Sequence, residues 1–196
     1  MQSLSSIDSV ATLYRFCAQS MQYPEAAWFT GDYLQSLHRL LEALGGSEEI
    51  DDLLTACRND ATLLEDLQIE YTRLFINGFP HVAAPPYGSV YLDKTLRGKY
   101  SDEVLNFYHS LGYNLRENAD LPDNIIYQLE FLSFLAEDRN KEGEREFLRR
   151  FFLPWFSIFA DRVKGEAHHP FYRIIVTLID FFTKEEEEHG VQFDEA

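Results

Sequence analysis

The chain has 196 residues, enough for one domain with a substantial core or for two small ones. Hydrophobic residues make up 45% of the chain and aromatic residues 15%, which is typical of a folded globular protein. The formal net charge of -16 disfavours nucleic-acid binding through the phosphate backbone, because that mode requires a basic surface. A cationic partner fits this charge, and so does an acidic surface that serves solubility alone.

The cysteine content and the hydropathy of the chain indicate in which cellular compartment the protein is expected. Cys17 and Cys57 are too few and too far apart for a metal-ligand pattern or a disulfide framework, so we expect a reducing environment. The N-terminus lacks the basic segment and apolar run of a signal peptide. Nowhere does the chain contain the roughly 18 consecutive apolar residues that a membrane-spanning helix needs. We therefore expect a soluble, cytoplasmic protein without an integral membrane segment.

Helical spacing of apolar residues predicts four helices in the first part of the chain, at about 6–23, 33–44, 47–57 and 60–76. Ser5 or Ser6 is the expected N-cap of the first helix, and Asp60 that of the fourth. Gly45 and Gly46 end the second helix, because glycine adopts the positive φ of a helix C-terminus. This glycine pair is a stop signal and not a phosphate-binding loop.

The second part of the chain predicts further helices at about 89–93, 101–111, 125–135, 142–159 and 170–182. Ser89 is expected near the start of the first of these, and Asp123 or Asn124 caps the third. Pro154 should kink or break the fourth helix. No stretch shows strand-like alternation. We expect one all-α domain of about nine helices over residues 1–196, with an acidic C-terminal end at 184–196.

The loop at residues 77–88 is unusually apolar and rich in proline. Surface loops are ordinarily rich in Ser, Asn, Asp and Gly, and prolines stiffen this loop in an extended form. Two interpretations remain open. The loop packs onto the core, or it forms a semi-rigid apolar ledge on which another chain lies.

Catalytic motifs are missing. Gly88-Ser89 is only a fragment of a nucleophile elbow, and no Walker A or dinucleotide-binding pattern occurs. His168-His169 lacks the companions of a metal site, since adjacent helical residues do not converge on one ion. Glu70 and Glu130 remain as a possible catalytic carboxylate pair, although bonding of these acids to the backbone or to Arg73 is the favoured interpretation. We expect no enzymatic activity, no catalytic residue, no metal and no cofactor.

Three blocks of sequence carry a family resemblance: EYTRLF at residues 70–75, PPYGSVYLD at 85–93, and PDN at 122–124 leading into LEF at 129–131. Their identities, order and separation resemble the TorD/DmsD/NarJ group of cytoplasmic chaperones. The resemblance is strongest over about residues 60–136 and extends to the region of Pro170, Phe171 and Tyr172.

The resemblance implies an all-helical chaperone. It would bind the twin-arginine signal peptide, or the apo form, of a molybdenum-cofactor oxidoreductase of the dimethyl sulfoxide or trimethylamine N-oxide reductase type, and delay export until the cofactor is inserted. Such a leader combines basic and apolar segments, so its receptor needs acidic and apolar surface together. The expected peptide-binding residues are Tyr71, Leu74, Phe75, Phe79, Pro86, Tyr87, Ser89, Tyr91, Asp123 and Asn124. Asp123 would face the arginines.

Two departures from the family pattern affect this expectation. Family members often have Trp at the position of Tyr87 and His at the position of Asn124. Asn cannot titrate near neutral pH as His does, so a pH-sensitive role there is in doubt. Simple helix capping by Asp123 and Asn124 is an alternative to peptide binding, and both roles are compatible.

Two further alternatives are open. A NarJ-like factor would assemble a reductase subunit without reading an export signal. The protein is expected to be a monomer, or a dimer formed by helix exchange about the proline-rich loop or the segment 114–121.

Overall fold

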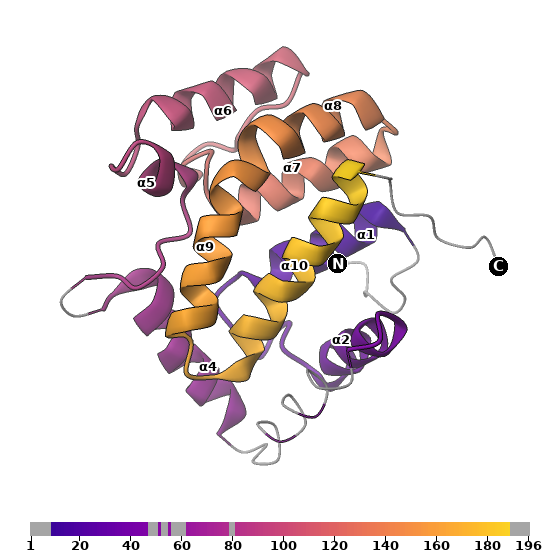
Figure 1. The fold of residues 1–196 in the computed structure, drawn as a ribbon, viewed down its shortest axis with the longest axis vertical. Helices are drawn as coiled ribbons and strands as arrows, with labels where there is room; N and C mark the ends of the chain where they lie inside the picture. The colour runs from indigo at the N-terminus through magenta and orange to yellow at the C-terminus, as the bar shows by residue number, and fades with distance from the viewer. Residues whose placement is uncertain (1–8, 47–50, 52–54, 56–61, 79–80, 189–196) are drawn as a thin grey trace.

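The computed structural model describes residues 9–46, 51, 55, 62–78 and 81–188, and its regular elements are helices (Figure 1). The predicted all-α class is confirmed. The elements, in chain order, are α1 (Val10–Ser20), α2 (Gly31–Ala43), α4 (Leu63–Tyr71), η1 (Thr72–Ile76), α5 (Gly88–Leu92), α6 (Lys99–Ser110), α7 (Ile125–Glu137), α8 (Lys141–Phe147), η2 (Leu148–Phe152), α9 (Leu153–Glu166) and α10 (Pro170–Glu188).

The core is built around two helix pairs, α1 with α7 and α9 with α10. On α7, Ile125, Leu129 and Leu132 are completely buried, as the apolar circumference of that helix predicts. Aromatic rings from α9 and α10 are also part of the core. Trp155, Phe156 and Tyr172 are each 0% exposed. Each such side chain contributes roughly 1.5–3 kcal/mol relative to an exposed one. The long helices are therefore held by packing more than by propensity.

The helix starts agree in part with the predicted ones. Asn124 caps α7, because its side-chain oxygen accepts the Ile126 N–H at 2.9 Å. The cap of α1 is Ser9 and not Ser5 or Ser6, since the Ser9 hydroxyl accepts the Thr12 N–H at 3.2 Å. The helix predicted at 47–57 lies outside the described residues, apart from two isolated positions. Asp60, the expected cap of the fourth helix, is also outside them, and the residue at the N-cap position of α4 is Thr62.

Two helices contain a π-helical turn. α4 passes directly into η1, and α8 passes through η2 into α9. The second turn ends just before Pro154, whose missing N–H removes one hydrogen bond from the ladder. The predicted kink is present: Figure 1 shows α9 leaving α8 at a large angle. The chain bends at this point without interrupting the helix.

Among the helices of the described residues, none combines the length and the apolar content required to cross a membrane.

Candidate functional site

The segments 86–89 and 122–125, which carry two of the three family blocks, meet in one place; we call this contact the junction. The Gly88 N–H donates to the Asp123 carbonyl at 3.1 Å, and the Ile125 N–H donates to the Pro86 carbonyl at 3.0 Å. Tyr87 and Asn124 thereby form an antiparallel β-bridge. Blocks that are more than 30 residues apart in the chain are thus joined through their backbones.

Asp123 holds the junction together from inside. Its carboxylate is 0% exposed, and its Oδ2 accepts the Ser89 N–H at 2.7 Å. It therefore caps α5, a helix from the other segment, whereas we expected it to cap α7 or to face an arginine. The other oxygen, Oδ1, has no hydrogen-bond partner among the described residues. Ser89 is not a cap; its hydroxyl accepts the Arg97 N–H at 3.2 Å.

Gly88 is required at the junction by a close approach. A Cβ added to Gly88 would lie 2.3 Å from Cε1 of Tyr100 and 3.0 Å from the Trp155 ring. Both rings are fixed by Gln128, which donates to the Tyr100 hydroxyl at 3.2 Å and accepts the Trp155 indole N–H at 3.1 Å. The glycine of the second block is thus a packing residue.

The surface of the junction is polar and aromatic. Tyr87 is half-buried, and its hydroxyl donates to Oδ2 of the exposed Asp120 at 2.6 Å. The same oxygen accepts from Nδ2 of Asn124 at 3.2 Å. Burial, followed by the hydrogen bond to Asp120, raises the pKa of Tyr87 well above its usual value, so the phenol stays protonated. Sequence reasoning missed Asp120, since nothing in a short polar segment indicates which acid meets Tyr87.

Most of the expected apolar ledge lies inside the protein. Leu74 is 0%, Phe75 5% and Tyr91 3% exposed. Tyr71 is also buried, and its hydroxyl donates to the Met21 carbonyl. The rings of Phe75 on η1 and Tyr91 on α5 pack on rings of the protein itself, among them Phe159 and Tyr172, so they offer no surface to a peptide in this structure. The prediction that these side chains form an exposed apolar ledge is therefore wrong for this structure.

The remaining expected residues divide between core and surface. Pro86 and Ser89 are buried, which leaves Tyr87 as the predicted apolar contact with substantial exposure. Phe79 lies outside the described residues. A peptide-binding role for these ten residues stays a prediction, but among those that the structure describes only Tyr87 is not buried.

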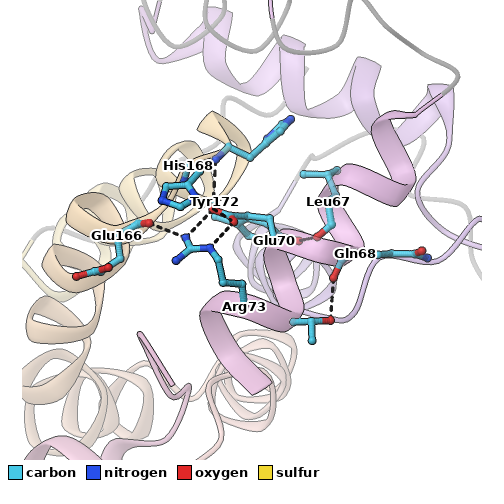
Figure 2. A network of polar contacts seen from close by, with 9 residues as sticks. Leu67, Gln68, Glu70, Arg73, Glu166, His168 and Tyr172 are labelled. Atoms are coloured by element: carbon cyan, nitrogen blue, oxygen red, sulfur yellow. Dashed lines mark hydrogen bonds and ion pairs between the residues drawn. The ribbon is translucent and has the colours of Figure 1, made fainter. Parts of the chain in front are cut away.

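Glu70 and Arg73 link three helices (Figure 2). Glu70 accepts two hydrogen bonds from Arg73, at 2.8 and 3.0 Å, and the backbone N–H groups of His168 and His169 at 2.5 and 3.3 Å. Arg73 also donates to the Glu166 carbonyl at 2.6 Å. The anion thus lies at the beginning of α10 and the cation at the end of α9, where each helix dipole favours that charge.

The hydrogen bonds to Glu70 favour a structural role for this residue over a catalytic one. Burial alone would raise the pKa of Glu70, but the hydrogen bonds from Arg73, His168 and His169 outweigh it and lower the pKa. A carboxylate that is held ionised and saturated with donors is a poor general acid or base. The structural interpretation of Glu70 is confirmed. The two histidines contribute backbone N–H groups here, and the described residues hold no cluster of three or more metal-ligating side chains.

Comparisons with known proteins place the chain in a family. The family model described as "Nitrate reductase delta subunit" matches residues 31–161, more than half of the chain. The Tat proofreading chaperone DmsD of Salmonella typhimurium is 32% identical over 115 residues, or 57% of this chain and 55% of the relative. The match therefore spans about half of that relative's length.

Two further similarities cover more of the chain. The chaperone protein TorD of Vibrio parahaemolyticus is 25% identical over 171 residues, or 76% of this chain and 78% of the relative. A crystal structure of a candidate redox enzyme maturation protein from Archaeoglobus fulgidus has a TM-score of 0.61 and 29% identity, and covers 96% of this chain and 100% of that one. The protein therefore belongs to the nitrate reductase delta subunit family, and it is similar to relatives that are named chaperones and to a structure described as a redox enzyme maturation protein.

Proposed function

We propose that this protein is a non-enzymatic cytoplasmic chaperone for a molybdenum-cofactor oxidoreductase of the dimethyl sulfoxide or trimethylamine N-oxide reductase type. It binds the twin-arginine signal peptide of that enzyme, its apo form, or both, and holds the client for cofactor insertion before export. The client surface is the exposed part of the junction, with Tyr87 as an aromatic contact and Asp120 as a polar one, which the buried Asn124 holds in place by a hydrogen bond.

The observation that carries this proposal is the junction itself. It brings two separate sequence blocks, which resemble those of the chaperone family, into one backbone-bonded unit. An aromatic ring and a carboxylate then lie side by side at the surface. A leader with basic and apolar segments needs both kinds of contact. The net charge of -16 favours a cationic ligand over a long range.

Calorimetry with the leader peptide of the cognate reductase tests the proposal. We expect saturable binding that weakens as salt is added, because part of the attraction is between charges. A twin-lysine version should bind more weakly, since lysine cannot reproduce the planar donor fork of arginine. Equal affinity for the two peptides would refute specific arginine recognition.

Tyr87→Ala localises the binding. It should weaken leader binding about tenfold, in the range of a partly buried aromatic contact. Phe181→Ala, which removes a 50% exposed aromatic ring from α10, is the matched control and should leave affinity unchanged. Equal losses in both variants would remove the junction from the binding mechanism. Leu74→Ala is unsuitable, because emptying a fully buried site costs roughly 2–5 kcal/mol of folding free energy.

An assembly factor of the NarJ kind is the alternative, and the description of the matching family model as a nitrate reductase subunit favours it. This factor would act on a catalytic subunit without reading an export signal. Affinity capture from the native host separates the two functions. A leader-bearing precursor among the captured proteins supports the first function, and a leaderless reductase subunit supports the second.

A further inference from the structure

A cavity of about 330 Å³ lies between the connection that follows α6 and the outer face of α7. Five of its twelve lining residues are aromatic, and Glu130 is the acidic side chain that α7 contributes to it. The lining residues are Tyr108, Tyr113, Asn114, Leu115, Arg116, Glu117, Asn118, Ala119, Tyr127, Glu130, Phe131 and Phe134. We call this hollow the Glu130 pocket.

The Glu130 side chain is half-buried, and its carboxylate has acceptor positions that the described residues do not use. Within the described parts of the chain, the hydrogen bond to Glu130 from another side chain goes to its backbone carbonyl, from the Ser133 hydroxyl, and not to its carboxylate, although an ionised carboxylate has about four acceptor positions. Burial raises the pKa of Glu130, and the positive charge of Arg116 only partly opposes this shift. A partly desolvated carboxylate whose acceptor positions are not taken by the protein can accept donors from a ligand, and such hydrogen bonds are stronger here than at the open surface.

The aromatic walls are already in position. Tyr113 stacks on Phe134 with ring centroids 5.9 Å apart and an interplanar angle of 12°, and it meets Phe131 edge-on at 5.2 Å. Tyr108 packs against Phe131 at 4.3 Å. Rings that support one another lose little freedom when a ligand enters. Aromatic faces also attract a cation and cover the apolar stem that carries it.

The pocket adjoins the junction. The Tyr127 side chain lines the pocket, and its hydroxyl accepts the backbone N–H of Asp120 at 3.1 Å. Asp120 in turn binds Tyr87 and Asn124 at the junction. The pocket is therefore connected to the junction through Asp120 and Tyr127.

We propose that the Glu130 pocket is the subsite for one arginine side chain of the bound client peptide, with the guanidinium on the Glu130 carboxylate and the methylene stem between the aromatic walls. This inference rests on the proposed function, because it takes a peptide bound at the junction as its starting point. The planar fork of a guanidinium can donate two parallel hydrogen bonds to one carboxylate, and it also stacks on rings. One carboxylate provides for one arginine, so the pocket reads a single position of the pair.

Calorimetric titration of a double-mutant cycle tests the subsite. The twin-arginine leader and two versions with a single arginine replaced by glutamine are titrated into wild type, Glu130→Gln and Glu117→Gln. Glu117 lines the same pocket but is exposed, so its substitution is matched in charge and differs in burial. We expect Glu130→Gln to weaken binding of the intact leader about tenfold, the scale of one charge-assisted hydrogen bond. Glu117→Gln should stay within about twofold of wild type.

The single-glutamine peptides identify the arginine. One of them should bind wild type about tenfold more weakly, and Glu130→Gln should add no further loss for that peptide. The other peptide should remain sensitive to Glu130→Gln. Equal binding of the intact leader to wild type and Glu130→Gln, or fully additive losses for both single-glutamine peptides, would overturn the subsite and leave the proposed function standing. Absence of saturable leader binding to wild type would overturn both.

Discussion

Two carboxylates on different helices, α4 and α7, show how differently the same side chain is used. Glu70 on α4 is 6% exposed and accepts four hydrogen bonds from Arg73, His168 and His169. Glu130 on α7 is half-buried beside rings, and no described residue donates to its side chain. The pKa of the first is lowered and that of the second is raised. A saturated acid stabilises the fold, whereas an open one keeps its binding capacity for another molecule.

The largest expected difference between the two acids is in folding free energy. Glu70→Ala should destabilise the protein by roughly 3 kcal/mol, because it leaves Arg73 unpaired and the backbone donors of His168 and His169 without their acceptor. Glu130→Ala should change stability by less than about 0.5 kcal/mol. Urea unfolding followed by circular dichroism measures both. Glu65→Ala, at an exposed position in the first turn of α4, controls for the loss of one acidic charge. Equal destabilisation by Glu70→Ala and Glu130→Ala would remove the contrast.

Asp123 is an intermediate case, since one of its oxygens is bonded and the other is not. Asp123→Ala should cost about 1–2 kcal/mol, the usual loss for a helix cap, because α5 then loses the acceptor of its Ser89 N–H. Asp123→Asn retains one acceptor oxygen and should recover part of this loss. The same unfolding experiment gives both values. If Asp123→Ala unfolds at the urea concentration of the wild type, the cap does not hold the junction.

The contributions of Glu70 and Glu130 to the free energy of unfolding should change with pH in opposite directions. The pKa of Glu70 is lower in the folded state than the value of about 4.3 in an unfolded chain, so its stabilisation is present above that value and is lost as pH falls through the folded pKa. The pKa of Glu130 is raised, so its contribution becomes unfavourable as pH rises from the unfolded value through the folded one.

Unfolding curves at a series of pH values check these signs. Glu70→Gln should lose less stability than wild type on acidification, because the group that titrates is gone. Glu130→Gln should gain slightly on wild type once the pH exceeds the raised pKa. A shared pH profile for both variants would mean that the two carboxylates have equivalent environments.

Much of the fold follows from local patterns. Apolar spacing predicted the helices, and Asn124 was recognisable as a cap because its acceptor lies two residues from the N–H that it binds. The same local patterns placed the cap of α1 too early, at Ser5 or Ser6 instead of Ser9, since three serines near one helix start are equivalent by composition.

The site was less predictable because its partners are distant in the chain. Asp123 caps a helix start 34 residues away, and Glu70 binds N–H groups 98 and 99 residues away. Periodicity correctly grouped Leu74 and Phe75 on one face, but it does not tell whether such a face meets a partner or the protein's own core. For the same reason, Glu70 and Glu130 could not be distinguished before their surroundings were known.

The π-helical turn at η2 also affects how relatives should be aligned. A turn of this kind takes up one residue more than an α-turn, so every side chain after Phe152 is advanced by one position relative to a continuous α-helix. Trp155, Phe156 and Phe159 belong to the same core as Phe147 and Phe151, so the buried face of the helix continues across the bend. A homologue without the π-turn would keep the same core with one residue fewer. Alignments of this helix should therefore allow a single-residue gap between positions 148 and 152.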